Sequence, residues 1–107
     1  MKIHVDFSVI TKSGEAIGHV NGLLDCFVEP QMGDTISFML SPEGITIPLG
    51  HVFGGLLKVN SRVIRLDGTE IPLSLELEDF LVDTREQAIE LMKYFESSFK
   101  LYANYYQ

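Results

Sequence analysis

The sequence predicts an α+β domain in which about six short antiparallel strands form a small barrel or sandwich-like sheet, followed by one long C-terminal amphipathic helix. Two observations lead to this class. Turn signals recur every 8–12 residues or so through most of the chain, with alternating apolar and polar residues between them. The last part of the chain changes to apolar spacings of three and four, which are typical of a helix. We therefore expect a single globular domain over residues 1–107, with the β part at 1–82 and the helix at 83–104.

The first part of the chain predicts strands joined by tight turns. Asn21-Gly22 is a strong signal for a type I′ hairpin, because this turn needs positive φ at both central residues. With a four-residue loop before the second strand, Phe7 is expected opposite Gly18, where the missing side chain leaves room for a ring. The expected elements are a strand at 3–10, a turn at 11–14, a strand at 16–20 and a strand at 23–29.

The middle of the chain predicts further short strands separated by turns that contain Gly or Pro. The apolar alternates change from odd to even positions between Val59 and Ile64. Because a slip of one residue reverses the faces of a strand, we expect a β-bulge near Asn60-Ser61. The expected strands are 35–40, 45–48, 56–66 and 71–78.

The C-terminal helix is predicted from its start signal and its apolar stripe. Thr84 and Gln87 have the spacing of a capping box, in which each side chain bonds the backbone of the other residue. A helix from 84 to 103 is about 30 Å long, so we expect its far end to project past the sheet or to meet another chain. The stripe consists of Ala88, Leu91, Met92, Phe95, Phe99 and Tyr102.

Composition excludes several classes of protein. The chain has 15 acidic and 8 basic residues, a formal net charge of −7, and one cysteine. An acidic balance argues against binding to a phosphate backbone, and no apolar run is long enough to span a membrane. We therefore expect neither nucleic acid nor a membrane as a partner. Asp6 interrupts any apolar signal core, which favours a cytoplasmic protein whose Cys26 is a small buried hydrophobe.

The excess acid is concentrated in one segment. Residues 67–96 hold nine acids and two bases, whereas acids and bases balance in the remainder. A solvated outer face explains part of this cluster, since acids such as Glu86 are favourable near a helix N-terminus. The functional interpretation is a surface for a basic protein partner, or a mimic of nucleic acid. Its candidate contact residues are Glu76, Glu78, Glu86 and Glu90.

Aromatic residues are also concentrated near the C-terminus, where all four tyrosines of the chain lie. Tyr94 and Phe95 are adjacent, so on a helix they cannot both point at the centre of one packed face. Core packing with a frayed tail would account for the set, but tyrosine is enriched at interfaces. We favour self-association, with a dimer as the simplest form. The candidate contact residues are Tyr94, Phe99, Tyr102, Tyr105 and Tyr106.

The residues available for catalysis are few. The three histidines, at positions 4, 19 and 51, have no spacing typical of a metal site, so we expect no catalytic residue, no metal and no cofactor. The glycines of residues 50–55 do not match a phosphate-binding loop. A loop on a rigid scaffold is nevertheless a common place for a binding site. His51 and Phe53 are therefore the candidate ligand-binding residues of an alternative hypothesis.

The leading hypothesis is a non-enzymatic module that acts by protein contact. It would bind itself or a partner through its acidic, aromatic C-terminal strand and helix. The first alternative is a small-ligand binder or minor enzyme with a pocket near residues 50–55. The second alternative is an acidic mimic of nucleic acid.

Overall fold

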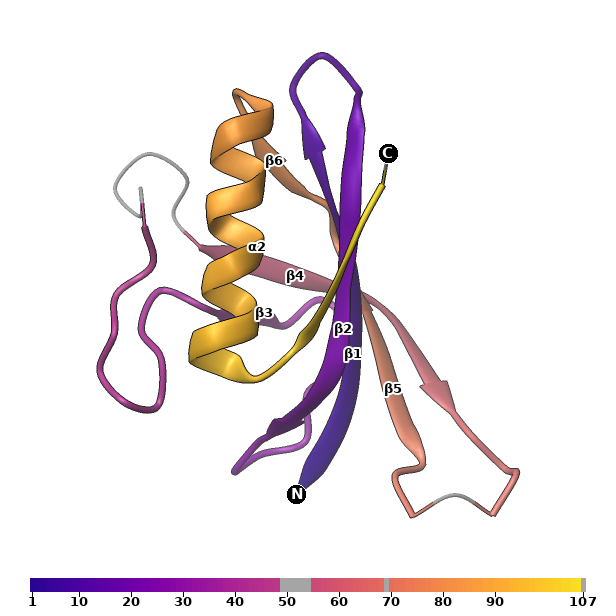
Figure 1. Cartoon of the computed structure of the whole chain (residues 1–107). Helices are drawn as coiled ribbons and strands as arrows, with labels where there is room; N and C mark the ends of the chain where they lie inside the picture. The colour runs from indigo at the N-terminus through magenta and orange to yellow at the C-terminus, as the bar shows by residue number, and fades with distance from the viewer. Residues whose placement is uncertain (49–54, 69, 107) are drawn as a thin grey trace.

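The computed structural model describes residues 1–48, 55–68 and 70–106. Within them, the chain forms a seven-stranded sheet and the C-terminal helix α2, Arg85–Phe99 (Figure 1). The strand order is β3-β4-β5-β1-β2-β7, and β6 also pairs with β1. The α+β class predicted from the sequence is therefore confirmed. The strands are β1 Lys2–Thr11, β2 Ala16–Asp25, β3 Thr35–Ser37, β4 Leu56–Ile64, β5 Leu73–Leu77, β6 Phe80–Val82 and β7 Tyr102–Tyr105.

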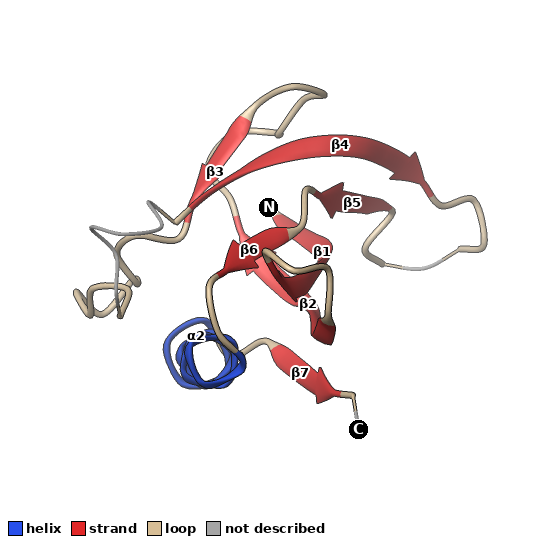
Figure 2. Cartoon of the chain, turned by 90° about the horizontal axis from the view of Figure 1, so that it is seen from above, coloured by secondary structure: helices blue, strands red, loops and turns tan. Residues whose placement is uncertain are grey.

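The sheet is mixed and not closed, so the expected antiparallel barrel or sandwich is only partly confirmed. β1 is antiparallel to β2 but parallel to both β5 and β6. Figure 2 shows the sheet curving around from β4 toward β2, with α2 and β7 at the far side. The strand order begins at β3 and ends at β7, and β6 has β1 as its one partner among the described strands. Alternation of apolar residues specifies which face of a strand is buried, but it specifies neither the partner strand nor its direction.

The N-terminal hairpin is longer than the sequence predicts. β1 and β2 pair around the expected turn, where Gly14 has φ 95°. The hairpin expected at Asn21-Gly22 is wrong, because both residues lie inside β2, and no separate strand covers 23–29. Gly22, at φ 150°, packs under Leu101, where a Cβ would be 2.9 Å from Leu101 Cδ2. This glycine therefore allows a close approach and does not make a turn.

The expected pairing of Phe7 with Gly18 is also wrong. Phe7 pairs with Val20, and Gly18 pairs with Val9. The register shifts between Val9 and Ile10, where β2 has one extra residue. A prediction of register from loop length alone has no means of including that irregularity.

Two bulges keep apolar residues on one face of the sheet. The bulge expected near Asn60-Ser61 is confirmed by a register shift between Val59 and Ser61. A second one separates β5 from β6, because the partners of β1 advance by one extra residue between these strands. In a regular strand an odd-numbered and an even-numbered residue point to opposite faces, but this bulge allows both Leu77 and Phe80 to be buried. β6 was therefore not predicted from the alternation of apolar residues.

All four strands predicted for the middle of the chain are shorter in the structure, including the one predicted at 71–78, which is limited to β5, Leu73–Leu77. The strand predicted at 35–40 is limited to β3, and the one predicted at 45–48 is reduced to an isolated bridge between Leu40 and Thr46. β4 ends at Ile64.

The helix begins where the sequence predicts but ends earlier. The capping box of Thr84 and Gln87 is confirmed. The helix stops at Phe99 because Lys100 adopts the left-handed conformation, with φ 58°. The Leu101 N–H then donates to the Phe95 carbonyl oxygen at 3.2 Å, and the buried Leu101 side chain anchors the turn. The prediction of helix over residues 100–104 is therefore wrong. After the turn, the chain returns to the sheet as β7.

The core lies between α2 and one face of the sheet. Phe95 is fully buried, with its ring centroid 4.9 Å from that of Phe7 and 5.2 Å from that of Phe38. The opposite face carries His4, Asp6 and other polar residues of β1 and has no helix over it in the described part of the chain. We call it the helix-free face. Within the described residues, the fold thus presents one open face and unpaired strand sides at β3, β6 and β7.

Candidate protein-contact site at the β7 edge

β7 is an edge strand with one unoccupied side. It pairs with β2 from Gly18↔Tyr105 to Asn21↔Tyr102, and the Tyr106 N–H donates to the Ile17 carbonyl oxygen at 2.8 Å. Backbone N–H and C=O groups alternate in direction along an antiparallel strand. Because those of Tyr106 point toward β2, those of the other even-numbered residues of this segment do so as well. The N–H and C=O groups of Ala103 and Tyr105 therefore point away from β2. No strand of the described residues pairs with that side.

The β7 edge has few of the features that usually protect an edge strand. Natural sheets block their edges with charged residues, proline, bulges or covering elements. The four residues of β7 are Tyr, Ala, Asn and Tyr, and the β2–β7 ladder has an unbroken register. β7 is short, but neither charge, proline nor a bulge within it would prevent another strand from pairing with its free side.

The side chains of Tyr102 and Asn104 lie on the helix-free face, as their register partners Asn21 and His19 do, and the Tyr106 side chain contacts His19 on the same face. Asn104 Nδ2 donates to His19 Nε2 at 3.1 Å, and His19 Nδ1 is 3.0 Å from the Tyr106 hydroxyl. The neutral histidine with its proton on Nδ1 satisfies both bonds. Tyr102 is 73% exposed. On this face, Tyr102 at the start of β7 and Tyr106 directly after it therefore flank Asn104, and His19 of β2 bonds both Asn104 and Tyr106.

Tyr105 projects to the other side of β7, toward α2. Its hydroxyl donates to Glu96 Oε1 at 2.8 Å. Burial, together with this hydrogen bond and the Glu96 charge, raises the pKa of Tyr105 to about 12. The phenol therefore remains a donor to Glu96 through the physiological range and ties β7 to the helix.

Replacing Tyr105 with phenylalanine is expected to remove the tyrosine ionisation near pH 12 from an ultraviolet titration. An acid whose pKa rises on folding stabilises the fold below its unfolded pKa, and that contribution is lost as pH rises through the folded value. For Tyr105 this window runs from the ordinary pKa of 10.0 to about 12, so unfolding of Tyr105→Phe should depend less on pH there. Tyr106→Phe serves as the control and should keep the ionisation. Persistence of that ionisation in Tyr105→Phe would contradict the assignment.

The structure divides the predicted aromatic contact residues into two groups. Tyr102, Tyr105 and Tyr106 come together on or beside β7. Tyr94 instead lies in the core, where its hydroxyl donates to the Phe38 carbonyl oxygen at 2.6 Å. Phe99 is half-buried against Phe38, with ring centroids 5.1 Å apart. Tyr94 and Phe99 therefore lie away from β7, because the helical stripe packs inward, and their part in a protein contact stays a prediction.

The predicted acidic residues do not form one surface. Glu76 pairs in register with Asp6 on the helix-free face. Glu78 accepts a hydrogen bond from the Lys58 backbone N–H at 2.9 Å, which gives it a structural role at the bulge. Glu86 and Glu90 are exposed on α2, which covers the opposite face of the sheet. The continuous acidic strand–helix face expected from the sequence is therefore absent from these four residues.

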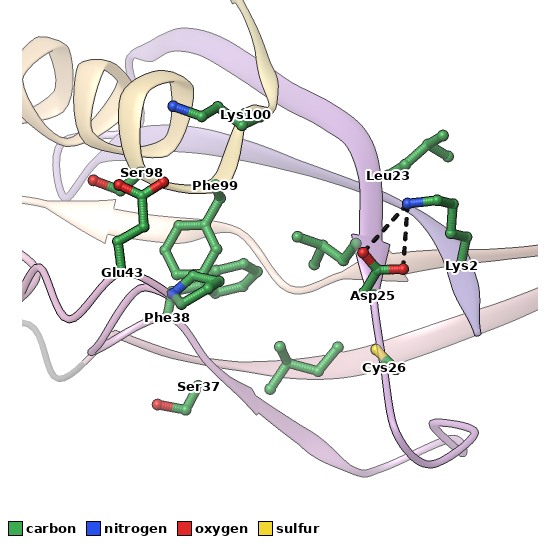
Figure 3. A pocket seen from close by; sticks show the side chains of 13 residues that line it. Lys2, Leu23, Asp25, Cys26, Ser37, Phe38, Glu43, Ser98, Phe99 and Lys100 are labelled. Atoms are coloured by element: carbon green, nitrogen blue, oxygen red, sulfur yellow. Dashed lines mark hydrogen bonds and ion pairs between the residues drawn. The ribbon is translucent and has the colours of Figure 1, made fainter.

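A cavity of about 470 Å³ lies between the end of β2, the segment around β3 and the C-terminal end of α2 (Figure 3). Lys2 and Asp25 form an ion pair of 3.2 Å at its rim. Burial raises the pKa of the Cys26 thiol, which disfavours the reactive thiolate. The predicted ligand residues His51 and Phe53 lie outside the described residues. The apolar part of the lining consists of Leu23, Leu24, Ile36, Phe38, Pro42 and Phe99.

Comparison with known proteins gives no relative: no family model, curated protein or solved structure matches the chain significantly. Across residues 1–48, 55–68 and 70–106, no group of three or more His, Cys, Asp or Glu side chains is placed to hold a metal ion. No helix within these ranges is long and apolar enough to cross a membrane. The site must therefore be interpreted from its geometry.

β7 was not predicted as a strand, although Tyr102 and Tyr105 within it and Tyr106 directly after it were predicted as contact residues. The signal was the alternation of Tyr102, Asn104 and Tyr106, which favours a strand because tyrosine has a high β propensity. The helical stripe extended as far as Tyr102 and obscured this signal. Residue 100 is lysine rather than the glycine that usually marks a left-handed helix end.

Proposed function

We propose that the protein is a non-enzymatic module that acts by protein–protein contact, and that its contact element is the free edge of β7. The observation that carries this proposal is the outward direction of the Ala103 and Tyr105 backbone groups. Strand addition provides hydrogen-bond partners for such groups, and side chains on the two faces provide specificity. Tyr102 and Tyr106 would supply contact area on the helix-free face.

The test is a probe strand: an acetylated peptide with the sequence of residues 101–107, added to dilute protein while amide hydrogen exchange is measured. Exchange at Ala103 and Tyr105 should slow, because their N–H groups become bonded. Exchange at Tyr102 and Asn104, which already face β2, should change little. A control peptide with N-methyl groups at the positions of Ala103 and Tyr105 should have much less effect. Unchanged exchange at saturating peptide would contradict the proposal.

A second candidate function is binding of a small apolar molecule in the cavity beside Cys26. The pocket expected near residues 50–55 is not tested, because residues 49–54 lie outside the described part of the chain. The volume of the cavity beside Cys26, about 470 Å³, lies in the range typical of small-molecule sites. The probe is the fluorescent dye anilinonaphthalene sulfonate. Ile36→Trp should fill the cavity and abolish dye binding, whereas Ile45→Trp, at an exposed position outside the lining, should not. Equal binding by the two variants would place the dye elsewhere.

Mimicry of nucleic acid is not proposed. Such a mimic needs its acids on one surface to imitate a charged backbone. Glu76 lies on the helix-free face, whereas Glu86 and Glu90 lie on the helix that covers the other face.

A further inference from the structure

We propose that the strand added to β7 is β7 of a second copy, paired antiparallel about a twofold axis at Asn104. This inference rests on the proposed function and adds the identity of the partner and the register. The two sheets would join through their β7 edges into one continuous sheet. Such an interface is isologous, because the same strand contributes to both sides.

The register follows from the direction of the backbone groups. In an antiparallel pair, two opposed residues exchange both N–H···O bonds only if both turn those groups toward each other. Ala103 and Tyr105 are the outward residues of β7. Placing Ala103 of each copy opposite Tyr105 of the other uses every outward group of the strand. Asn104 then lies opposite Asn104 of the second copy.

The neighbouring register centred on Ala103 is poorer. If Ala103 faced Ala103 of the second copy, Tyr105 would have to pair with Leu101. The Leu101 N–H already donates to the Phe95 carbonyl oxygen at the end of the helix. That register therefore leaves Tyr105 without one of its bonds.

Side-chain sizes also suit the Asn104-centred register. On the α2 side, the large Tyr105 would lie opposite the small Ala103. On the helix-free face, Tyr102 would lie opposite Tyr106, and aromatic cross-strand pairs stabilise antiparallel sheets. Both pairs occur twice because of the twofold axis.

The charge distribution predicts an unusual response to salt. Residues 101–107 carry no charged side chain, whereas each chain has a net charge of −7. The pairing strands therefore do not repel each other, but the two molecules do so at long range. Raising the ionic strength from about 0.01 M to about 0.15 M shortens the Debye length from about 30 Å to about 8 Å and should strengthen the dimer. Contact between the acidic residues and a basic partner would weaken instead.

Disulfide trapping tests the register, in a Cys26→Ser background that removes the native thiol. Residues opposed as a non-hydrogen-bonded pair have Cα atoms about 4.5 Å apart, which is within the range of a disulfide. Asn104→Cys should therefore give a covalent dimer on mild oxidation. The matched variant Ala103→Cys should not react with itself, but it should form a heterodimer with Tyr105→Cys. Self-trapping of Ala103→Cys in preference to Asn104→Cys would overturn the register.

A charge swap gives a second test that needs no oxidation. Asn104→Asp and Asn104→Lys would each place like charges opposite one another, and each should raise the dimer dissociation constant about fivefold. A mixture of the two variants should associate more tightly than either alone. A wild-type protein that remains monomeric at millimolar concentration, with no trapping of Asn104→Cys, would overturn the second-copy partner. Under that result, slowing of exchange by the peptide probe would still support the proposed function with a different protein, whereas no slowing would remove both.

Discussion

Replacing Phe95 with alanine is expected to lower the free energy of unfolding by about 3–5 kcal/mol, the largest effect predicted for any single change considered. The Phe95 side chain is completely buried. Its ring contacts Phe7 of β1, Phe38 after β3 and Phe80 of β6, with ring centroids 4.9, 5.2 and 6.0 Å away. Truncation would remove contacts to three separate segments and leave a cavity where they meet.

Urea unfolding measures this loss as a lower midpoint with an unchanged slope. Phe27→Ala is the matched control, because it deletes the same atoms from a side chain that is fully exposed. Its effect should be within about 0.5 kcal/mol of zero. A loss below about 1 kcal/mol for Phe95→Ala would be too small for a core substitution and would contradict the packing of α2 described above.

Replacing Gly18 with alanine is expected to displace β7 and to destabilise the fold by about 1–3 kcal/mol. A Cβ at Gly18 would overlap the Asn104 carbonyl oxygen of β7 and would lie 2.6 Å from Met92 Cε of α2. The methionine end can move aside, but the backbone oxygen cannot move without loosening the strand. Gly18→Ala should therefore weaken strand addition as well as stability.

Amide exchange separates this local effect from a general loss of stability. In Gly18→Ala, the amides of Tyr102 and Asn104 should lose protection more than those in the centre of β1. Gly44→Ala is the control: it also strains a glycine, at φ 86°, but nothing lies within 4 Å of the added Cβ. That variant should lose stability without selective exposure of β7. Equal protection of β7 in the two variants would contradict the close approach of β2 and β7.

Local signals predicted the parts of the fold that local interactions determine. The capping box needs only Thr84 and Gln87, which are three residues apart. The bulge near Asn60-Ser61 was predictable because the apolar positions change from odd to even numbers within one strand. The α+β class followed from the change in hydrophobic period. In each case the physical cause lies within a few residues of its effect.

The remaining features depend on contacts between distant residues. Asn21-Gly22 has strong turn propensity, yet Gly22 is needed in β2 because Leu101 packs onto it. The parallel pairing of β1 with β5 and β6 leaves no mark in the alternation of either strand. The helix end at Lys100 has no glycine signal, because burial of Leu101 and pairing with β2 stabilise the left-handed residue. This last feature also determines the candidate site, since it converts a predicted helical tail into an edge strand.

The solution mass of the wild-type chain, compared with that of Ala103→Pro, tests the central claim most directly. The Ala103 N–H points away from β2, so proline there removes a donor from the free edge without removing a bond of the β2–β7 ladder. Sedimentation equilibrium should show the wild type passing from its 12.0 kDa monomer toward twice that mass as concentration rises. Ala103→Pro should remain at 12.0 kDa with the same fold by circular dichroism. A wild type that stays monomeric throughout, or a proline variant that dimerises equally well, would contradict self-association through the β7 edge.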